Sequence, residues 1–376
     1  MNRPVVELRP QPGPQETFLS TPADIAVYGG AAGGGKSFGI LLEAARHTGN
    51  PDFGGVIFRR TSPMITNEGG LWDESNKIYP LLAAVPKETD HSWEFASKAV
   101  VSFSHLQHEK NKLDWQGAQI CFLGFDELTH FTESQFFYML SRNRSTCGVR
   151  PYVRATTNPD AESWVAEFIS WWIDQETGLP IAERAGRLRY FIRVNDRLKW
   201  ADDPADLEDD FRVIHDALPP DVREQTRRED FIKSVTFIPS NVYDNKKLLA
   251  SNPQYLANLL SLPLVERERL LGGNWKVKAT AGKVFNREWF EIRSEVPAKI
   301  DLVVSYWDFA ATEKQLKGDD PDYTARMTIA YSKKEKQWMF LDMLAVQRSP
   351  ADVEKLFAQT CQMDRDLAKR HGARFM

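Results

Sequence analysis

A glycine-rich segment followed by lysine and serine is the part of the sequence whose residue types and spacing most clearly suit a chemical task. Residues 30–37 read Gly-Ala-Ala-Gly-Gly-Gly-Lys-Ser and fit the pattern G-x-x-x-x-G-K-[ST] without a mismatch. Glycines let the backbone fold around phosphates with its N–H groups pointing inward; here they are Gly30, Gly33, Gly34 and Gly35. In such a loop Lys36 neutralises the β- and γ-phosphates of ATP, and Ser37 ligates Mg²⁺. The alternative is a flexible glycine turn followed by a lysine that has no role in binding.

Two adjacent carboxylates supply the partner that a phosphate loop needs for hydrolysis. The apolar run 120–125 ends in Asp126 and Glu127. Asp126 can hold Mg²⁺ through water beside Ser37, and Glu127 can polarise the attacking water as a general base. Together with the glycine-rich loop, this pair predicts an ATP-hydrolysing site rather than simple nucleotide binding.

Three further groups of residues are candidates for the same site. Thr156, Thr157 and Asn158 end the next apolar run and could sense the γ-phosphate, although an ordinary Asn-Pro turn is the alternative. Arg142 and Arg144 could stabilise transition-state charge, and two surface arginines are an equally good interpretation. Gln15 could read the adenine edge, or it is polar filler near the N-terminus.

Elements able to position these residues are visible in the hydrophobic pattern. Short apolar runs at 25–28, 56–58, 100–103, 120–125 and 152–155 predict buried strands, and the stretches 38–47 and 133–142 between some of them predict helices. Strands that alternate with helices indicate a covered, largely parallel sheet. The glycine-rich loop then lies between a strand and a helix, and both carboxylates lie at a strand end, where ligands gather in open α/β sheets.

The charge is unevenly distributed along the chain. The net charge is -4, but residues 201–230 hold eleven acidic and four basic side chains, a net of -7, which leaves +3 elsewhere. We expect an acidic helical insertion over about 200–230. Just before it, Arg187, Arg189 and Arg193 alternate with apolar residues, which predicts a strand with one basic face.

Cysteine usage and the N-terminus favour an intracellular protein. The three cysteines are widely separated, so neither a zinc site nor a disulfide framework is indicated. The first 14 residues are polar and proline-rich, without an apolar run long enough for a signal peptide or a membrane span.

The last part of the sequence has a different pattern. Strands are predicted at 302–307, 324–331 and 338–344, followed by a helix to Arg370 that begins after Ser349-Pro350. The pattern of a further strand begins at Arg374, just before the final residue Met376. We therefore expect a second domain that is truncated.

With these residues in view, the chain resembles the large terminase subunit of tailed bacteriophages. The resemblance rests on five stretches together: 28–37, 58–61, 124–131, Thr156-Thr157-Asn158-Pro159 and Tyr306–Ala310, with 267–275 similar to the lid segment of that family. It implies a RecA-like ATPase domain of the additional-strand type at 1–295, with a lid at about 235–280. It further implies that 296–376 begin a ribonuclease-H-like nuclease domain, here incomplete. The function that the resemblance implies for this α/β protein is that of an ATP-driven motor that packages viral DNA.

The same resemblance implies partners and further site residues. The motor is a homo-oligomeric ring on the capsid portal that works with a small terminase subunit and double-stranded DNA, in the host cytoplasm and transiently on the procapsid. Thr156–Asn158 match the coupling motif, and Arg142 and Arg144 lie where some relatives place an arginine that acts on the neighbouring subunit. Asp308 matches the first metal-binding aspartate of the nuclease, with Asp322 as an auxiliary ligand for Mg²⁺ or Mn²⁺. Because two-metal cleavage needs several carboxylates, we expect the chain to hydrolyse ATP weakly and not to cut DNA.

Contacts with DNA would need only basic side chains at suitable spacing, since no base-reading motif is present. The candidates are Arg59, Arg60, Arg187, Arg189 and Arg193. A solvated basic surface is the alternative. Two other functions stay open at this point: a nucleic-acid-stimulated helicase or repair ATPase, and a prophage remnant that only binds DNA.

Overall fold

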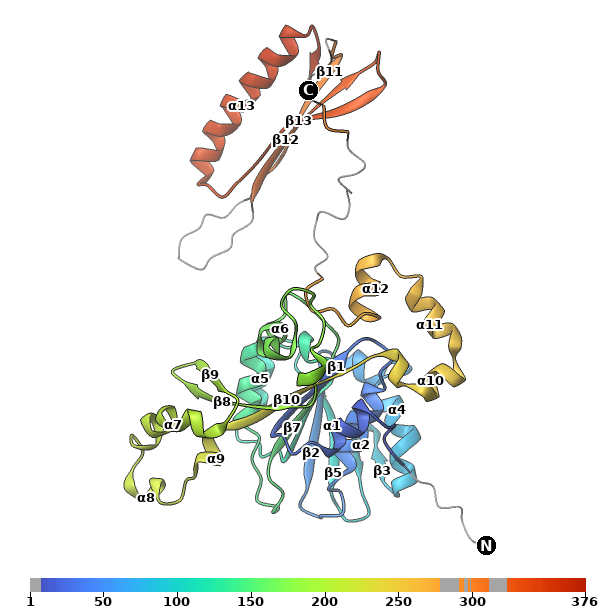
Figure 1. Ribbon diagram of the computed structural model, residues 1–376, viewed down its shortest axis with the longest axis vertical. Helices are drawn as coiled ribbons and strands as arrows, with labels where there is room; N and C mark the ends of the chain where they lie inside the picture. The colour runs from blue at the N-terminus through green and yellow to red at the C-terminus, as the bar shows by residue number, and fades with distance from the viewer. Residues whose placement is uncertain (1–7, 278–290, 294–296, 298, 311–322) are drawn as a thin grey trace. The chain divides into compact units, whose positions relative to one another are not determined.

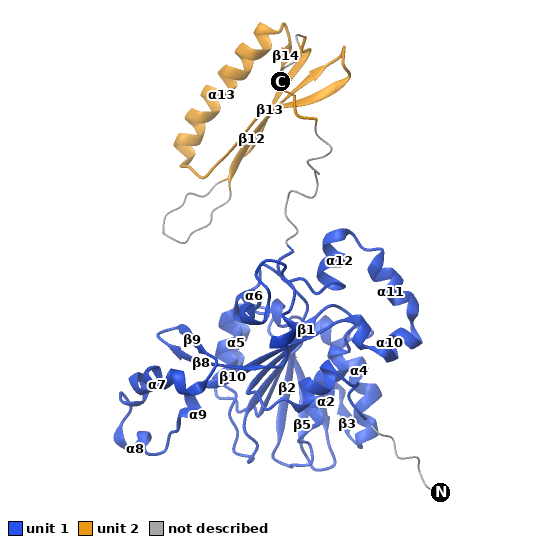
Figure 2. Ribbon diagram, in the orientation of Figure 1, with its two compact units in different colours: residues 1–280 blue, residues 281–376 orange. Residues whose placement is uncertain are grey.

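The chain divides into two compact units, residues 1–280 and 281–376 (Figure 2). The computed structural model describes residues 8–277, 291–293, 297, 299–310 and 323–376. Each unit is built around its own sheet. None of the helices in these described ranges is long and apolar enough to cross a membrane.

A ten-stranded sheet forms the centre of the first unit, with the order β3-β4-β5-β2-β6-β7-β1-β10-β8-β9 (Figure 1). The six strands from β5 to β10 in this order run parallel, and antiparallel strands flank them at both edges. The bounds are β1 Ile25–Gly30, β2 Gly54–Arg59, β3 Val85–Lys87, β4 Ser92–Glu94, β5 Val100–His105, β6 Phe122–Phe125, β7 Tyr152–Thr157, β8 Leu188–Val194, β9 Arg197–Ala201 and β10 Lys233–Ser240. The prediction of a mainly parallel α/β sheet is confirmed.

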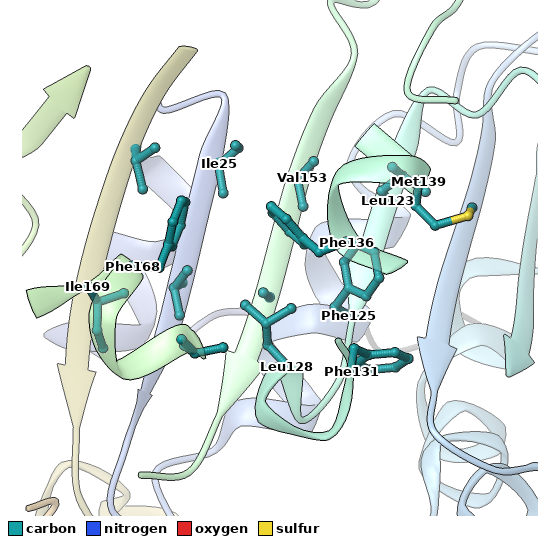
Figure 3. Packing of buried hydrophobic residues seen from close by; sticks show 14 of the residues in the cluster. Ile25, Leu123, Phe125, Leu128, Phe131, Phe136, Met139, Val153, Phe168 and Ile169 are labelled. Atoms are coloured by element: carbon teal, nitrogen blue, oxygen red, sulfur yellow. The ribbon is translucent and has the colours of Figure 1, made fainter. Parts of the chain in front are cut away.

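Helices cover both faces of this sheet, which is why its central strands are apolar throughout. Every residue of β1, β6 and β7 is buried. On one face, Phe136 and Met139 of α5 (Glu133–Leu140) and Phe168 of α6 (Trp164–Phe168) pack on Ile25 and Val153 (Figure 3). The opposite face carries α1, α2, α3 and α4, with bounds Pro14–Ser20, Lys36–Ala45, Ser62–Thr66 and Leu71–Ile78.

The strand order brings three strand ends together at one edge. Strand β7 lies between β1 and β6, so the strand that feeds the glycine-rich loop and the strand that ends in the two carboxylates are separated by one added strand. Gly29 is paired with Thr157, and Phe125 with Ala155. All three strands are parallel, so their carboxyl ends meet at this edge.

The acidic stretch forms three short helices beside a hairpin. Strands β8 and β9 are joined at Asn195 and Asp196, which have positive φ values of 50° and 60°. The helices α7 (Glu208–His215), α8 (Pro220–Arg223) and α9 (Arg228–Phe231) follow, and Phe211 and Ile232 pack against the hairpin residue Ile192. These helices lie in the region for which an acidic helical insertion was expected.

Three helices follow β10, in the region for which a lid was expected. They are α10 (Lys246–Ser251), α11 (Pro253–Leu260) and α12 (Leu264–Leu270). Pro253 is the first residue of α11, a position where the N–H that proline lacks is not needed, and Pro263 directly precedes α12.

The second unit has a four-stranded sheet in the order β13-β12-β11-β14. Strands β11 (Leu302–Asp308), β12 (Thr324–Ser332) and β13 (Gln337–Val346) form an antiparallel meander, and β14 (Arg374–Phe375) pairs in parallel with β11. Helix α13 (Pro350–Arg370) connects β13 to β14 and contributes Ala368 to a small core with Val303 and Ala330. These elements lie where the hydrophobic pattern predicted them.

Candidate active site

The glycine-rich loop connects β1 to α2, as the motif requires. Gly30, Gly33 and Gly35 have φ values of 128°, 78° and 74°, a region that favours glycine. A Cβ atom on Gly30 would lie 2.8 Å from the carbonyl oxygen of Ser240. The backbone path of the loop therefore excludes side chains at these positions.

Side chains from distant segments hold the carbonyl groups of this loop. Tyr28 donates its hydroxyl to the carbonyl of Gly34 at 2.7 Å, and Asn245 donates its amide to that of Gly33 at 2.8 Å. Gln15, which is buried, donates to the carbonyl of Gly35 at 2.8 Å and accepts from the N–H of Gln11 at 2.6 Å. These bonds turn the loop carbonyls away from the space that its N–H groups would need for phosphate. Gln15 supports the loop, and a contact with adenine stays a prediction.

Lys36 is directed toward the end of β7. Its ammonium group donates to the carbonyl of Ala31 at 2.7 Å and to Oδ1 of Asn158 at 2.8 Å. Burial lowers the pKa of Lys36 from its ordinary value, whereas the nearby carboxylates of Glu127 and Asp126 oppose that change. Both protein partners are neutral oxygens, so an anionic phosphate would be a stronger partner for this ammonium group.

Asn158 also contacts Glu127. The amide of Asn158 donates to Oε1 of Glu127 at 2.8 Å, and its backbone N–H donates to Oε2 at 3.2 Å. Asn158 thus connects the lysine of the phosphate loop to the candidate general base. Glu127 itself has a left-handed backbone, with φ 62° and ψ 64°.

Asp126 is almost completely buried, and both of its carboxylate oxygens are engaged. Thr156 donates its hydroxyl to Oδ1, and the guanidinium group of Arg59 lies 2.5 Å from Oδ2. Thr156 also accepts a hydrogen bond from the backbone N–H of Glu127 at 3.2 Å. Thr157 packs against Gly29, where a Cβ atom would lie 2.5 Å from the threonine side chain. The three residues Thr156, Thr157 and Asn158 therefore contact both the carboxylates and the loop.

The donor set suits magnesium, which the site would bind with a nucleotide. Mg²⁺ prefers oxygen ligands and is usually held by one or two carboxylates together with substrate phosphates. Ser37 begins α2 beside Lys36, and its hydroxyl makes no hydrogen bond within the described residues. Asp126 offers a carboxylate near the same loop. These residues have the oxygen donors that Mg²⁺ prefers, and the remaining ligands would be phosphate oxygens and water.

Arg142 and Arg144 lie at the opposite edge of the sheet from this site. The carbonyl of Arg142 accepts from the N–H of Ile120, and Arg144 donates to the carbonyls of Gly117 and Ala118 at 3.0 and 3.3 Å. These partners precede β6, whereas Asp126 follows it. Neither arginine therefore belongs to the nucleotide site of its own chain, and action on a neighbouring subunit stays a prediction.

The predicted basic strand face is largely occupied by contacts within the chain. Arg189 pairs with Asp202 at 2.7 Å and lies over the ring of Trp171, and Arg193 pairs with Asp196 at 3.1 Å and lies over the ring of Phe137. Between them on the same face, Phe191 is buried in the aromatic core. The predicted strand is present, but the face that carries Arg189 and Arg193 also carries a buried aromatic residue. Arg187 is exposed and makes no ion pair with any described residue.

Arg59 and Arg60 also differ from their predicted role. Arg59 faces Asp126, and Arg60 donates to the carbonyl of Leu106 and to Oε1 of Gln135, both at 3.0 Å. Neither guanidinium group is free on the surface, which argues against their assignment to DNA. The contact between Arg59 and Asp126 was not predicted because it depends on β2 lying next to β6. The local sequence pattern does not reveal the order of strands in a sheet.

The second unit contains a single predicted metal ligand among its described residues. Asp308 is exposed at the end of β11, and Asp322 lies outside the described residues. No group of three acidic, histidine or cysteine side chains suited to a metal occurs in the part of the chain that the structure describes. The most buried charges of this unit instead form a structural network, in which Arg326 pairs with Asp364 at 2.6 Å and with Asp342 at 2.8 Å.

Comparison with solved structures finds large terminases at low sequence identity. The large terminase of a thermophilic bacteriophage has 12% identity and a TM-score of 0.46, with 98% of this chain and 82% of that chain covered. The ATPase domain of the Thermus phage P74-26 large terminase has 12% identity and a TM-score of 0.42, with 72% and 100% covered. The HK97 bacteriophage large terminase has 11% identity and a TM-score of 0.38, with 99% and 70% covered. No curated protein matches the chain.

The family comparison is more direct. Residues 27–292 match the family described as the terminase large subunit, T4likevirus-type, N-terminal. This match spans well over half of the 376 residues and includes the loop, both carboxylates and the Thr156–Asn158 segment. The chain belongs to the terminase large subunit family.

Proposed function

We propose that this chain is the ATP-hydrolysing subunit of a motor that moves double-stranded viral DNA into a procapsid. The observation that carries the proposal is the connected set Lys36–Asn158–Glu127, which joins a phosphate-binding lysine to a general base across one edge of the sheet. By family, the subunit would act in a ring on the capsid portal, together with a small terminase subunit that selects the DNA.

Each residue of the site has a distinct task in this proposal. The loop N–H groups and Lys36 bind the phosphates, while Ser37 and Asp126 hold Mg²⁺. The ion neutralises charge on the β- and γ-phosphates when it is bound. Glu127 accepts a proton from the attacking water, and Asn158 holds both its carboxylate and the ammonium group of Lys36. Loss of the γ-phosphate would return Lys36 to Asn158, so the end of β7 would report the state of the nucleotide.

A steady-state ATPase assay with and without DNA tests the enzymatic part. Glu127→Gln keeps the size of the side chain but removes the base, so we expect kcat to fall by roughly 100- to 10,000-fold while ATP binding persists. Retention of full activity in this variant would refute the assigned base. A strand-displacement assay separates the motor from a helicase, since we expect translocation without unwinding.

Arg142 and Arg144 are proposed to complete the site of the adjacent subunit. Their position at the far edge of the sheet leaves them available to another copy. Among the described residues, Arg144 bonds only to backbone carbonyls. Arg142 donates to the hydroxyl of Ser141 and lies over the ring of Tyr138. Mixing tests this idea. Arg144→Ala subunits retain an intact loop, and Lys36→Ala subunits retain both arginines. We expect the mixture to hydrolyse more ATP than either variant alone, and a purely additive result would exclude action between subunits.

DNA contact is proposed for Arg187, the one predicted arginine of this strand region that is exposed without an ion pair among the described residues. Phosphate contacts release counterions, so each lost contact lowers the dependence of binding on salt. Arg187→Ala should therefore reduce the salt slope by about one unit, in the sense expected for one phosphate contact. An unchanged slope would remove Arg187 from the DNA path.

The second unit is proposed to be the start of a ribonuclease-H-like nuclease domain. An antiparallel meander followed by a helix and a strand parallel to the first strand supports this assignment, as does an aspartate at the end of that first strand. Asp308 would be a metal ligand there, with Asp322 as a second. We expect no cleavage of plasmid DNA by the 376-residue chain with Mn²⁺, because two-metal cleavage needs several carboxylates. Cleavage that Asp308→Ala abolishes would overturn this expectation.

A further inference from the structure

Arg59 occupies a position that the assigned ATPase residues do not explain. It ends β2, which lies beside β6, and the backbone N–H of Asp126 donates to the carbonyl of Phe58 at 2.9 Å. The two strands are thus in register up to Arg59 and Asp126, whose side chains meet. Nη2 of Arg59 lies 2.5 Å from Oδ2 of Asp126, and the two side chains are only 18% and 2% exposed.

No other described cation makes an ion pair with Asp126. Thr156 contributes a neutral hydroxyl to Oδ1, and Lys36 uses its ammonium group on Ala31 and Asn158. A buried carboxylate without a counter-charge is strongly destabilising, so Arg59 stabilises Asp126 in the absence of a nucleotide. The neighbouring Arg60 shows that this is specific to one position, because it bonds to Leu106 and Gln135 instead.

We infer that Arg59 is a positioning residue that holds Asp126 in the empty site and competes with hydrated Mg²⁺ for its carboxylate. This inference rests on the proposed ATPase function. A divalent ion that binds beside Asp126 meets the positive charge of Arg59, and the two cations repel each other across a partly buried site of reduced dielectric constant. Arg59 therefore sets the magnesium concentration at which a nucleotide binds tightly.

Binding of ADP to the full chain, measured by calorimetry across a magnesium titration and again in EDTA, tests this inference. In Arg59→Gln the repulsion is removed, and we expect the half-saturating magnesium concentration to fall by about tenfold, a change equivalent to about 1.4 kcal/mol. The affinity for ADP in EDTA should change little. Arg59→Lys, which restores the positive charge, should return the magnesium dependence toward that of the wild type.

Arg60→Gln is the matched control, since this arginine is also half-buried and makes no contact with a carboxylate. We expect its magnesium dependence to equal that of the wild type. If Arg59→Gln fails to fold because Asp126 is left unpaired, the double variant Arg59→Gln/Asp126→Asn carries no buried unpaired charge. Compared with Asp126→Asn alone, the double variant should need about tenfold less magnesium.

The outcomes separate this inference from the proposed function. A wild-type chain that does not bind ADP in a magnesium-dependent manner contradicts the ATPase assignment itself. Magnesium-dependent binding that is the same in the wild type, in Arg59→Gln and between the two Asp126→Asn variants overturns only the role of Arg59. A tenfold loss of ADP affinity in EDTA without a change in magnesium dependence also overturns it, because Arg59 would then be a phosphate ligand.

Discussion

Asn158 is the residue whose removal tests the site most directly, because it contacts the lysine and the base at once. Asn158→Ala removes two side-chain hydrogen bonds to ionised groups, from Nδ2 to Glu127 and from Lys36 to Oδ1, each 2.8 Å long. Such a bond contributes about 1.5–3 kcal/mol when its partner is charged. The backbone N–H of Asn158 and the carbonyl of Ala31 remain as partners of the two charged groups. Water also reaches the half-buried Glu127, so we expect the free energy of unfolding of the nucleotide-free chain to fall by about 3–4 kcal/mol, the lower part of the sum of about 3–6 kcal/mol for two such bonds.

Activity should change together with stability in this variant. Without Asn158 the carboxylate of Glu127 keeps only one oriented contact, so the attacking water is held less well and kcat should fall by roughly 10- to 100-fold. Differential scanning calorimetry and a steady-state ATPase assay measure the two effects. Asn50→Ala is a suitable control because it also removes two side-chain hydrogen bonds, to the carbonyl of Cys147 at 2.7 Å and from the N–H of Asp52 at 3.1 Å, away from the site. A nucleotide-free melting temperature and a kcat both equal to those of the wild type would refute the connection through Asn158.

Three other predictions concern the cysteines, the second unit and the glycine-rich loop. Burial raises the pKa of Cys121 to about 12, whereas at Cys147 the effect of burial is outweighed by hydrogen bonds from Ser145 and the backbone, which lower its pKa. Of these two thiols Cys147 has the larger thiolate fraction, so iodoacetamide should modify Cys147 before Cys121, as read by mass spectrometry, and equal labelling of the two would contradict this. Asp364→Ala leaves Arg326 buried without its closest partner and should lower the stability of the second unit by about 3–5 kcal/mol. Asp342→Ala removes the exposed partner of the same arginine and should cost less than about 1 kcal/mol, so similar melting curves for both variants would refute the argument. Gly30→Ala should abolish nucleotide binding because its Cβ atom would meet the carbonyl of Ser240, and normal binding in a fluorescence titration would show that the loop has another path.

Much of the site could be predicted because it depends on local patterns. The spacing from Gly30 to Ser37 specifies a loop between a strand and a helix, and an apolar run that ends in Asp126-Glu127 specifies a strand end. Once both are assigned to one parallel sheet, their meeting at the carboxyl edge follows. The acidic stretch after Ala201 was visible in the distribution of charge, and strands β11, β12 and β13 and helix α13 were visible in the hydrophobic pattern.

The parts that could not be predicted depend on strand order and on long-range contacts. Arg59 precedes Asp126 by more than sixty residues, and only the adjacency of β2 and β6 brings them together. The same limitation affected Arg189, whose partner Asp202 comes from the far end of a hairpin, and Gln15, whose contact with the loop depends on how α1 packs. Strands β3 and β4 have only three residues each, and neither shows a clear alternation of apolar and polar side chains. The sequence therefore offered little indication of them.

The backbone of Glu127 has a consequence for how this protein could evolve or be engineered. A non-glycine residue with φ near 62° is less stable than glycine would be there, by roughly 1–2 kcal/mol. Glu127→Gly relieves this strain but also removes both hydrogen bonds that Asn158 donates to the carboxylate, so the two effects oppose each other and the melting temperature should not rise. The strained backbone of Glu127 is thus held by the contacts of its own side chain, so the stability of this strand end and the position of the carboxylate depend on the same two hydrogen bonds.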